Sequence, residues 1–355
     1  MKRQIFRYNG NFELECGEVL DGLTLCYHIS QDFIKSEKCG DSLADGRKVV
    51  WITHALTANS NPCEWWDNLV GEGKFLDPRK YIIVCANIIG SPYGSTSPLS
   101  INSATGRPYM LGFPKITIRD IVKSLELLRM ELGIGSIDLL IGGSVGGFQA
   151  LEWSISAGDV IKNALFIACN TAVTPWNIAY NEAQKMALQA DSSFEEQSYS
   201  IADGGLVTAN GGLRGMAAAR AIALISYRSY TGYNTTQREN GCETLWNHRA
   251  ASYQRHQGEK LVKRFNAYSY NSMLTLFESH NIARGRGSLE KALRMIKANV
   301  VAVGIDSDSL FPPHEQRFIA DNTDKGLFRE MTSVFGHDGF LLEWQQLSAI
   351  IKEII

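Results

Sequence analysis

The amino-acid sequence predicts an α/β fold with a mostly parallel sheet covered by helices on both faces. Short apolar runs rich in Val and Ile recur along the chain at 49–53, 81–86, 137–141, 164–168 and 300–305. Amphipathic segments separate them. In the clearest of these, 118–132, apolar residues recur at helical spacing before Gly133 ends the helix. Continuous apolar strands that alternate with helices are typical of a parallel sheet buried on both faces.

The stretch at 172–285 interrupts this pattern and predicts an insertion. It contains no convincing buried strand, but it has helix-like pieces at 179–188, 216–225 and 260–277, and a polar, Gly-rich link at 203–212. The sheet pattern resumes at Val300. We therefore expect a first core part at 1–171, a helical lid at 172–285 and a second core part at 286–355. Such a lid would lie above the carboxyl ends of the strands, where open α/β sheets bind ligands.

Composition and charge exclude several classes of function. The chain has 355 residues, 45% hydrophobic and 20% charged, which is ordinary for a globular enzyme. Its net charge of −2 gives no electrostatic basis for binding nucleic acid or an anionic membrane. No apolar run is long enough to span a bilayer, and the N-terminus lacks the apolar core of a signal peptide. We expect a cytoplasmic protein.

The seven cysteines predict neither a disulfide framework nor a metal site. They form no C-x-x-C pair and no zinc-finger spacing, and several lie in apolar runs, which indicates reduced, buried thiols. Nucleotide-phosphate loops are also absent from the sequence. We therefore expect no metal and no cofactor.

The segment Gly142-Gly143-Ser144-Val145-Gly146 lies between an apolar strand and an apolar helix. Strand, Gly-x-Ser-x-Gly and helix in this order are the sequence form of a nucleophile elbow, the turn that exposes the reactive serine in the α/β-hydrolase fold. The turn is so tight that larger side chains at its glycines would collide with neighbouring elements. It would expose the Ser144 hydroxyl and aim the Val145 amide at a developing oxyanion.

A serine nucleophile needs a base, and the base needs an orienting carboxylate. In the α/β-hydrolase fold the chain order is serine, acid, histidine. His337 lies in a glycine-flanked loop, after a strand-like piece at 331–334 and before a C-terminal helix, where the base is expected. Of the other histidines after Ser144, His248 and His256 have polar surroundings, and His314 follows two prolines at a helix start.

Two carboxylates compete for the role of the acid. Asp306 and Asp308 both follow the apolar run 300–305, and in an extended chain they would point to the same side. Both could equally cap the turn that follows. The residues alone leave this choice open.

With these residues in place, the sequence resembles the homoserine O-acetyltransferase family over most of its length. The resemblance is carried by several segments: 53–57, 65–67 with 71–74 and Asp77, 87–90 with 94–98, 142–153, 219–220 with 226–229, 307–313 and 336–341. It implies an α/β-hydrolase fold and an acyltransferase of methionine biosynthesis. It also selects Asp308 as the acid.

The resemblance further implies a ping-pong reaction. Ser144 would take an acetyl group from acetyl-CoA, with His337 as the base, and pass it to the γ-hydroxyl of L-homoserine. The amides of Leu56 and Val145 would stabilise the oxyanion.

Other side chains would bind the amino acid. Carried over by motif, Arg220 would bind its carboxylate and Asp338 its ammonium, with Tyr227 also lining the site. Arg214 is the alternative to Arg220. A guanidinium fork matches a carboxylate in two-point contact. The family also implies a homodimer formed through the lid.

This chain departs from the family pattern near the mouth of the acyl pocket. Val145 and Phe148 replace common methionines, Ala58-Asn59 replaces Gly-Asp, and Pro92 and Ser97 replace Cys and Gly. One methylene in an apolar pocket discriminates by only about 1–3 kcal/mol. Succinyl-CoA as donor and serine as acceptor therefore stay open. The two remaining alternatives are a serine hydrolase and a non-catalytic binding protein on the same fold.

Overall fold

The structure is a computed structural model that describes residues 1–35 and 46–355. Within these residues one sheet of eight strands has the order β1-β2-β4-β3-β7-β8-β11-β12. Its strands are β1 (Lys2–Glu13), β2 (Val19–Ile29), β3 (Val49–Thr53), β4 (Ile82–Ala86), β7 (Leu139–Gly143), β8 (Asn163–Ile167), β11 (Asn299–Ile305) and β12 (Gly326–Met331). Neighbours from β4 to β12 are parallel, whereas β2 is antiparallel to both β1 and β4. The predicted mostly parallel sheet is confirmed.

Two of the expected strands differ from the observed ones by more than one residue. β7 begins at Leu139, because Ile137 forms only an isolated bridge with Ile161. The strand-like piece expected at 331–334 is wrong. β12 ends at Met331, and the chain then leaves the sheet towards the loop that carries His337. The β1–β2 hairpin was not predicted, because alternating exposed residues hide its apolar face from a search for continuous runs.

Each face of the sheet packs against its own helices. Trp51 of β3 packs edge-on against Trp153 of α3 (Val145–Ser156), with ring centroids 5.0 Å apart. On the same side lie α2 (Ile118–Glu131) and α11 (Pro313–Asp321), whereas Ile52 points to the other face, which α12 (Gly339–Leu342) and α13 (Trp344–Lys352) cover. The alternation along β3 therefore buries both of its faces.

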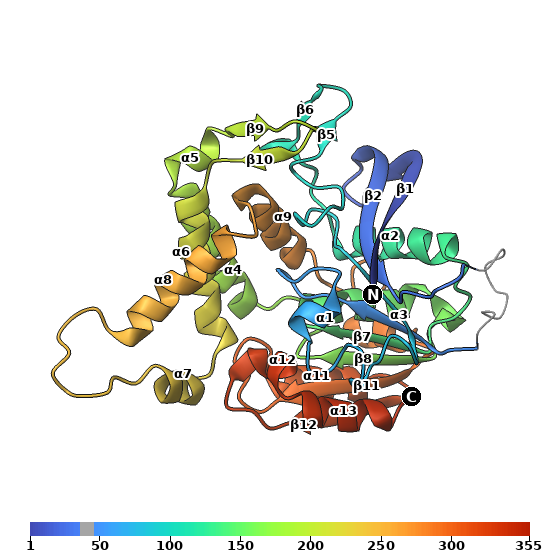
Figure 1. Ribbon diagram of the computed structural model, residues 1–355. Helices are drawn as coiled ribbons and strands as arrows, with labels where there is room; N and C mark the ends of the chain where they lie inside the picture. Colours follow the sequence, from blue (N-terminus) through green and yellow to red (C-terminus); the bar gives the residue numbers. More distant parts are fainter. Residues whose placement is uncertain (36–45) are drawn as a thin grey trace.

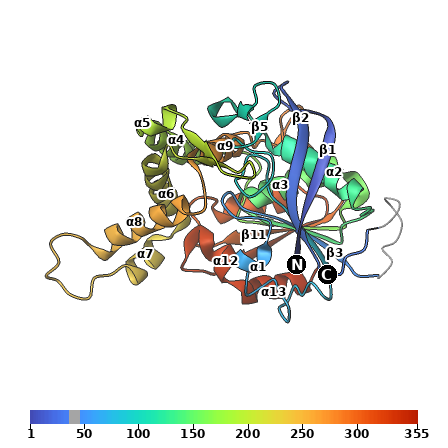
Figure 2. The same ribbon diagram turned by 45° about the horizontal axis from the view of Figure 1, so that its top comes forward.

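The lid occupies the chain between the adjacent strands β8 and β11. It contains α4 (Pro175–Gln189), α5 (Ser192–Glu195), the hairpin β9 (Tyr199–Ile201) and β10 (Val207–Ala209), α6 (Leu213–Tyr227), α7 (Tyr230–Thr236), α8 (Arg249–Val262) and α9 (Ala267–Glu278). Figures 1 and 2 both show α4 to α8 extending to one side of the sheet. The two hinge segments pair, since Ala172 and Asn281 form an antiparallel bridge.

Two expectations about the lid are wrong in detail. The piece expected as one helix at 260–277 is two helices, because Asn266 accepts the Ser269 amide and starts a new helix after α8 has ended. The expected link at 203–212 contains strand β10, so the lid is not purely helical.

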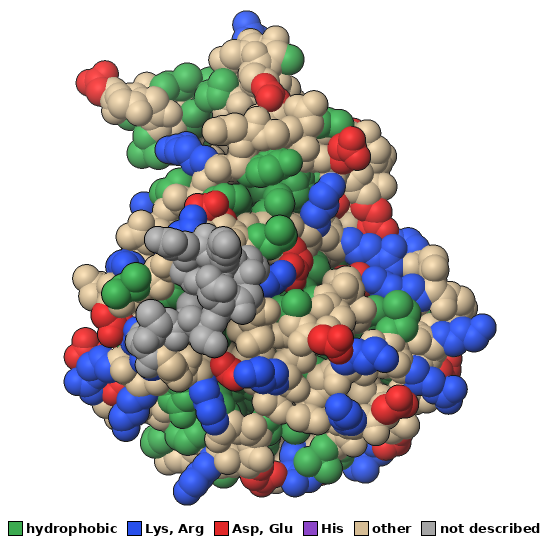
Figure 3. All heavy atoms as spheres, turned by 90° about the vertical axis from the view of Figure 1, so that its right-hand side faces the viewer, with side chains coloured by type: hydrophobic (Ala, Val, Ile, Leu, Met, Phe, Trp, Pro, Cys, Tyr) green, Lys and Arg blue, Asp and Glu red, His purple; other side chains and the backbone are tan. Residues whose placement is uncertain are grey.

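The surface and the remaining small elements complete the described structure. On the face that bears the β1–β2 edge, acidic and basic side chains are interspersed (Figure 3). Within residues 1–35 and 46–355, no helix is long and apolar enough to cross a membrane. Shorter elements are α1 (Pro62–Trp65), β5 (Ile101–Asn102), β6 (Arg107–Pro108), η1 (Met110–Gly112), η2 (Gly158–Val160), α10 (Leu289–Leu293) and η3 (Gly336–Asp338). The described cysteines are free thiols, and Cys39 lies outside the described residues.

Candidate active site

Ser144 occupies the tight turn between β7 and α3. Its φ of 57° and ψ of −127° place a non-glycine residue in a sparsely populated region, which costs of order 1–3 kcal/mol. The Ser144 amide donates to the Ile167 carbonyl of β8 at 3.0 Å, and this bond holds the turn against the neighbouring strand. The surrounding structure thus maintains the strained geometry that lifts a seryl hydroxyl above the sheet.

The glycines of the elbow are required by close contacts. A Cβ at Gly146 would lie 2.1 Å from the Thr53 carbonyl oxygen of β3, and one at Gly142 would lie 2.2 Å from the Gly146 oxygen. A Cβ at Gly143 would meet the ring of Phe340 at 2.6 Å. The sequence pattern of the elbow is therefore dictated by steric contacts with the neighbouring strand β3, within the turn itself and with the segment after His337.

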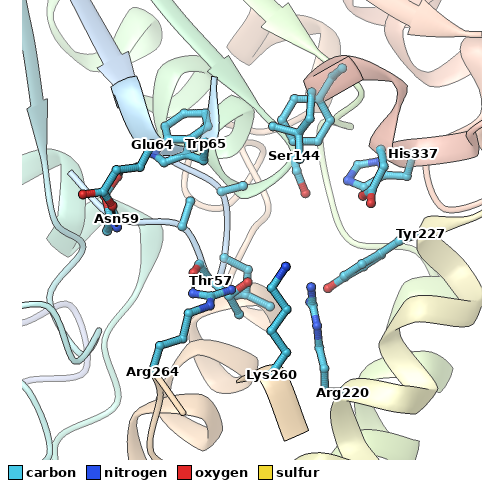
Figure 4. A pocket seen from close by; sticks show the side chains of 16 residues that line it. Thr57, Asn59, Glu64, Trp65, Ser144, Arg220, Tyr227, Lys260, Arg264 and His337 are labelled. Carbon is cyan, nitrogen blue, oxygen red and sulfur yellow. Dashed lines mark hydrogen bonds between the residues drawn. The ribbon is translucent and has the colours of Figure 1, made fainter. Parts of the chain in front are cut away.

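Asp308 and His337 form a buried pair beside this turn. The Nδ1–H of His337 donates to Asp308 Oδ2 at 2.8 Å, and each residue is 3% exposed. The other carboxylate oxygen of Asp308 accepts the amides of Leu310 and Phe311 at 2.8 and 3.0 Å. With Nδ1 donating, Nε2 is left as the free base nitrogen, and His337 and Ser144 line the same cavity (Figure 4).

Asp306 has a different position. Its Oδ1 accepts the amide of Ser333 at 3.0 Å, so it ties the end of β11 to the chain that follows β12. Ser307 adds to this link, because its hydroxyl donates to the Ser333 carbonyl and accepts the Gly336 amide. The structure therefore brings Asp308, and not Asp306, to the imidazole, while its neighbours hold the histidine loop in place.

The loop after β3 supplies the other side of the elbow. Within the described chain, the amide of Leu56 has no hydrogen-bond acceptor, and that of Val145 is the first of α3, where helical amides lack partners. Gln149 donates to the His54 carbonyl at 3.0 Å, and the His54 ring accepts the Ile88 amide at 3.0 Å. Burial lowers the pKa of His54 to about 4, so its neutral ring is a fixed support for the loop.

The cavity above Ser144 has a volume of about 380 Å³ and two unlike walls. The core wall carries Ser144, His337 and the 55–59 loop. The lid wall carries Arg220 of α6, Lys260 of α8 and Arg264, and Figure 4 shows the Arg220 and Lys260 side chains reaching towards the core wall. This arrangement places positive charge opposite Ser144.

All three predicted substrate-binding residues line this cavity. Arg220 and Tyr227 both line it, with the Arg220 guanidinium 5.3 Å from the centre of the Tyr227 ring. Arg214 is exposed at the other end of α6 and does not line the cavity. Asp338 lines the cavity but also forms an ion pair with Arg228, and its side chain does not cap α12.

Sequence reasoning missed Lys260 and Arg264. The two residues are four positions apart, which would place them on one face of a continuous helix. The expected single helix over 260–277 gave no reason to select that face, and the real break after Val262 turns Arg264 towards the 55–59 loop. The only feature of the sequence that could have selected these two residues for the cavity was their positive charge within the predicted lid.

Comparisons with known proteins first define the class. Residues 48–200 match the family described as alpha/beta hydrolase fold. A homoserine O-acetyltransferase from Bacillus anthracis superposes with a TM-score of 0.84 at 22% identity, covering 99% of this chain and 97% of that one. Esterase E22 superposes with a TM-score of 0.83 at 20% identity, covering 99% of each chain. At these identities the likeness establishes the fold, and it confirms the predicted α/β-hydrolase class.

Sequence similarity then defines the family. The homoserine O-acetyltransferase of Cyclobacterium marinum is 42% identical over 352 residues, covering 99% of this chain and 95% of that protein. This chain belongs to the homoserine O-acetyltransferase family, a family of acyltransferases, and the resemblance stated from its motifs is confirmed.

Proposed function

We propose that this protein transfers an acetyl group from acetyl-CoA to the γ-hydroxyl of L-homoserine by way of acyl-Ser144. The single observation that carries the proposal is the buried Asp308–His337 pair beside the strained Ser144 turn. Membership of the family supplies the substrates, and the site supplies the chemistry.

In the first half-reaction the Ser144 hydroxyl attacks the thioester carbonyl carbon. Its proton passes to His337 Nε2, and the carbonyl oxygen becomes an oxyanion that accepts from the amides of Leu56 and Val145. Collapse of this intermediate breaks the C–S bond, and the proton on His337 leaves with the CoA thiol. Asp308 keeps its hydrogen bond to Nδ1 and stabilises the imidazolium.

In the second half-reaction homoserine replaces the thiol. His337 Nε2 takes the proton of the γ-hydroxyl, whose oxygen attacks the acyl-enzyme carbonyl. The Ser144 oxygen then leaves and recovers the proton from His337, which releases O-acetylhomoserine. Arg220 binds the carboxylate of the amino acid, and Asp338 beside the base binds its ammonium. Tyr227 forms the wall between Arg220 and His337, with its ring centre 5.8 Å from that of His337.

The first test follows thiol release from acetyl-CoA with and without homoserine. The wild-type protein should release about one thiol per site without acceptor and turn over continuously with it, while mass spectrometry finds the acetyl group on Ser144. Ser144→Ala should abolish both phases, because it removes the hydroxyl that would carry the acetyl group. Rapid continuous turnover without acceptor would identify a hydrolase instead.

A second candidate, ester hydrolysis, is favoured by one observation: the esterase E22 structure shares this fold over its full length. Exclusion of water from the acyl-enzyme separates the two activities. Comparing acetyl-CoA with succinyl-CoA, each with homoserine and with serine, would also identify the donor and the acceptor. Acetyl-CoA with homoserine should give the highest kcat/KM.

We further infer that the protein acts in the cytoplasm as a homodimer formed through the lid, with no cofactor beyond its co-substrate. Acetyl-CoA is a substrate of that compartment, and serine, imidazole and carboxylate supply every group that the reaction needs. The lid exposes large apolar side chains that a second copy could cover, namely Ile201, Leu206, Ile225, Tyr230, Leu245 and Trp246. Light scattering of the purified protein would measure its oligomeric state.

A further inference from the structure

The loop that carries the Leu56 amide is held from outside by a side chain of the lid. Arg264 lies between α8 and α9, and its Nη1 donates to the Thr57 carbonyl, one residue beyond Leu56. The same nitrogen also donates to the hydroxyl of Tyr93. A residue 207 positions along the chain thus fixes the path of the loop next to the elbow.

Tyr93 completes this contact. Its hydroxyl donates to the Thr57 carbonyl at 3.3 Å, and its ring packs edge-on against Phe265 with centroids 5.7 Å apart. Burial raises the pKa of Tyr93, which keeps the phenol protonated and able to donate while it accepts from Arg264. Arg264, Tyr93 and the Thr57 carbonyl therefore form a closed set of hydrogen bonds between lid and core.

We propose that Arg264 is a positioning residue through which the lid sets the direction of the Leu56 amide. The inference rests on the proposed acyl transfer and deepens it. An oxyanion donor acts only when it lies about 2.7–3.1 Å from the developing charge, and a misplacement of about 1 Å can cost roughly a hundredfold in rate. The 55–59 loop is irregular, so its path depends on such external contacts.

The neighbouring cations show why Arg264 differs from a substrate contact. Lys260 lies on α8 one turn earlier, and its ammonium has no hydrogen-bond or ion-pair partner within the described part of the chain, so it is available to a ligand. The guanidinium of Arg264, by contrast, is engaged with protein acceptors. Because α6, with Arg220, packs on α8, the substrate-binding wall and the Leu56 loop are mechanically connected.

The experiment measures acylation in the absence of acceptor, in which the amplitude of thiol release counts competent sites and its rate reports chemistry at each site. Arg264→Ala should lower this rate by about 10- to 100-fold at unchanged amplitude. Arg264→Lys, which keeps one donor, should fall between this variant and the wild type. Lys263→Ala is the matched control, because that neighbouring side chain is exposed and forms no hydrogen bond or ion pair in the part of the chain described.

Tyr93→Phe provides an independent variant that keeps the ring packing and removes only the hydroxyl. It should slow acylation in the same direction as Arg264→Ala, by a smaller factor. A merely structural role would lower the amplitude and the melting temperature while leaving the rate per site unchanged, and this result would overturn the inference. A rate equal to that of the wild type in Arg264→Ala would do the same. If the wild-type protein itself forms no acyl-enzyme, the proposed function fails instead.

Discussion

The two walls of the cavity differ in how their polar groups are held. On the core wall, Ser144 and His337 are buried, and the buried Asp308 that accepts from His337 also accepts backbone amides. On the lid wall, Arg220 is half-buried, and Lys260 and Arg264 are exposed. Electrostatic interactions are stronger where water is excluded. The comparison teaches that the hydrogen-bonded histidine lies on the desolvated wall, whereas the cations of Arg220 and Lys260 lie on the wetter one. This difference fits the proposed separation of bond making from the recognition of charged substrates.

The largest expected effect comes from the core wall. Asp308→Asn should leave the fold intact and lower kcat by about 10³- to 10⁴-fold, because the amide no longer holds the imidazole tautomer that exposes a free Nε2. Single-turnover thiol release measures the loss. Asp306→Asn is the matched control. It keeps the oxygen that accepts the Ser333 amide, so the rate should stay close to that of the wild type. A larger loss of rate in Asp306→Asn than in Asp308→Asn would refute the choice of Asp308 as the acid.

A smaller effect of another kind is expected on the lid wall. Arg220→Lys should raise the KM for homoserine by about ten- to a hundredfold, since one charged two-point contact contributes about 1.5–3 kcal/mol. Acylation without acceptor should continue at the wild-type rate. Arg214→Lys on the same helix is exposed and away from the cavity, so it should change neither quantity. A loss of acylation in Arg220→Lys would contradict the proposal that the lid wall binds homoserine and takes no part in acylation.

The last prediction concerns stability and pH. His280 stacks on Phe148 with ring centroids 3.8 Å apart, its Nε2–H donates to the Asn170 carbonyl, and burial lowers its pKa to about 3. Between pH 6.5 and 3 the unfolded chain binds a proton that the folded chain does not. The free energy of unfolding therefore falls as the pH falls, by up to about 1.4 kcal/mol per pH unit.

His280→Asn should remove this contribution to the slope, as measured by urea unfolding at several pH values. His256→Asn, an exposed ring on α8, should leave the slope unchanged, because water surrounds that ring in the folded and unfolded states alike. Equal slopes in all three proteins would show that the His280 site takes up its proton without unfolding.

Sequence reasoning located the elements whose signal is local. β3 has the predicted limits. The elbow could be recognised from the sequence because close contacts exclude any side chain at Gly142 and Gly146. It also selected the pair that the structure brings together, although the choice of Asp308 over Asp306 needed the family resemblance. The catalytic and binding roles of these residues stay predictions until they are measured.

The features that escaped prediction depend on contacts distant in sequence. The Arg228–Asp338 ion pair joins the residue after lid helix α6 to the histidine loop, and Arg264 reaches Thr57 across 207 positions. The break after Val262 is set by Asn266, whose capping role competes with a good helical pattern on both sides. The hydrophobic periodicity of a single segment cannot predict such contacts, because they depend on how separate segments pack together.

The bridge between Ala172 and Asn281 brings the two ends of the lid together. The chain departs from and returns to the sheet through adjoining backbone, with the Val173 amide donating to the His280 carbonyl and the Ile282 amide to the Thr171 carbonyl. A segment whose ends already touch can be lengthened, trimmed or exchanged without stretching its host. This architecture would let the lid change in length or sequence while the sheet keeps the Ser144 turn in place.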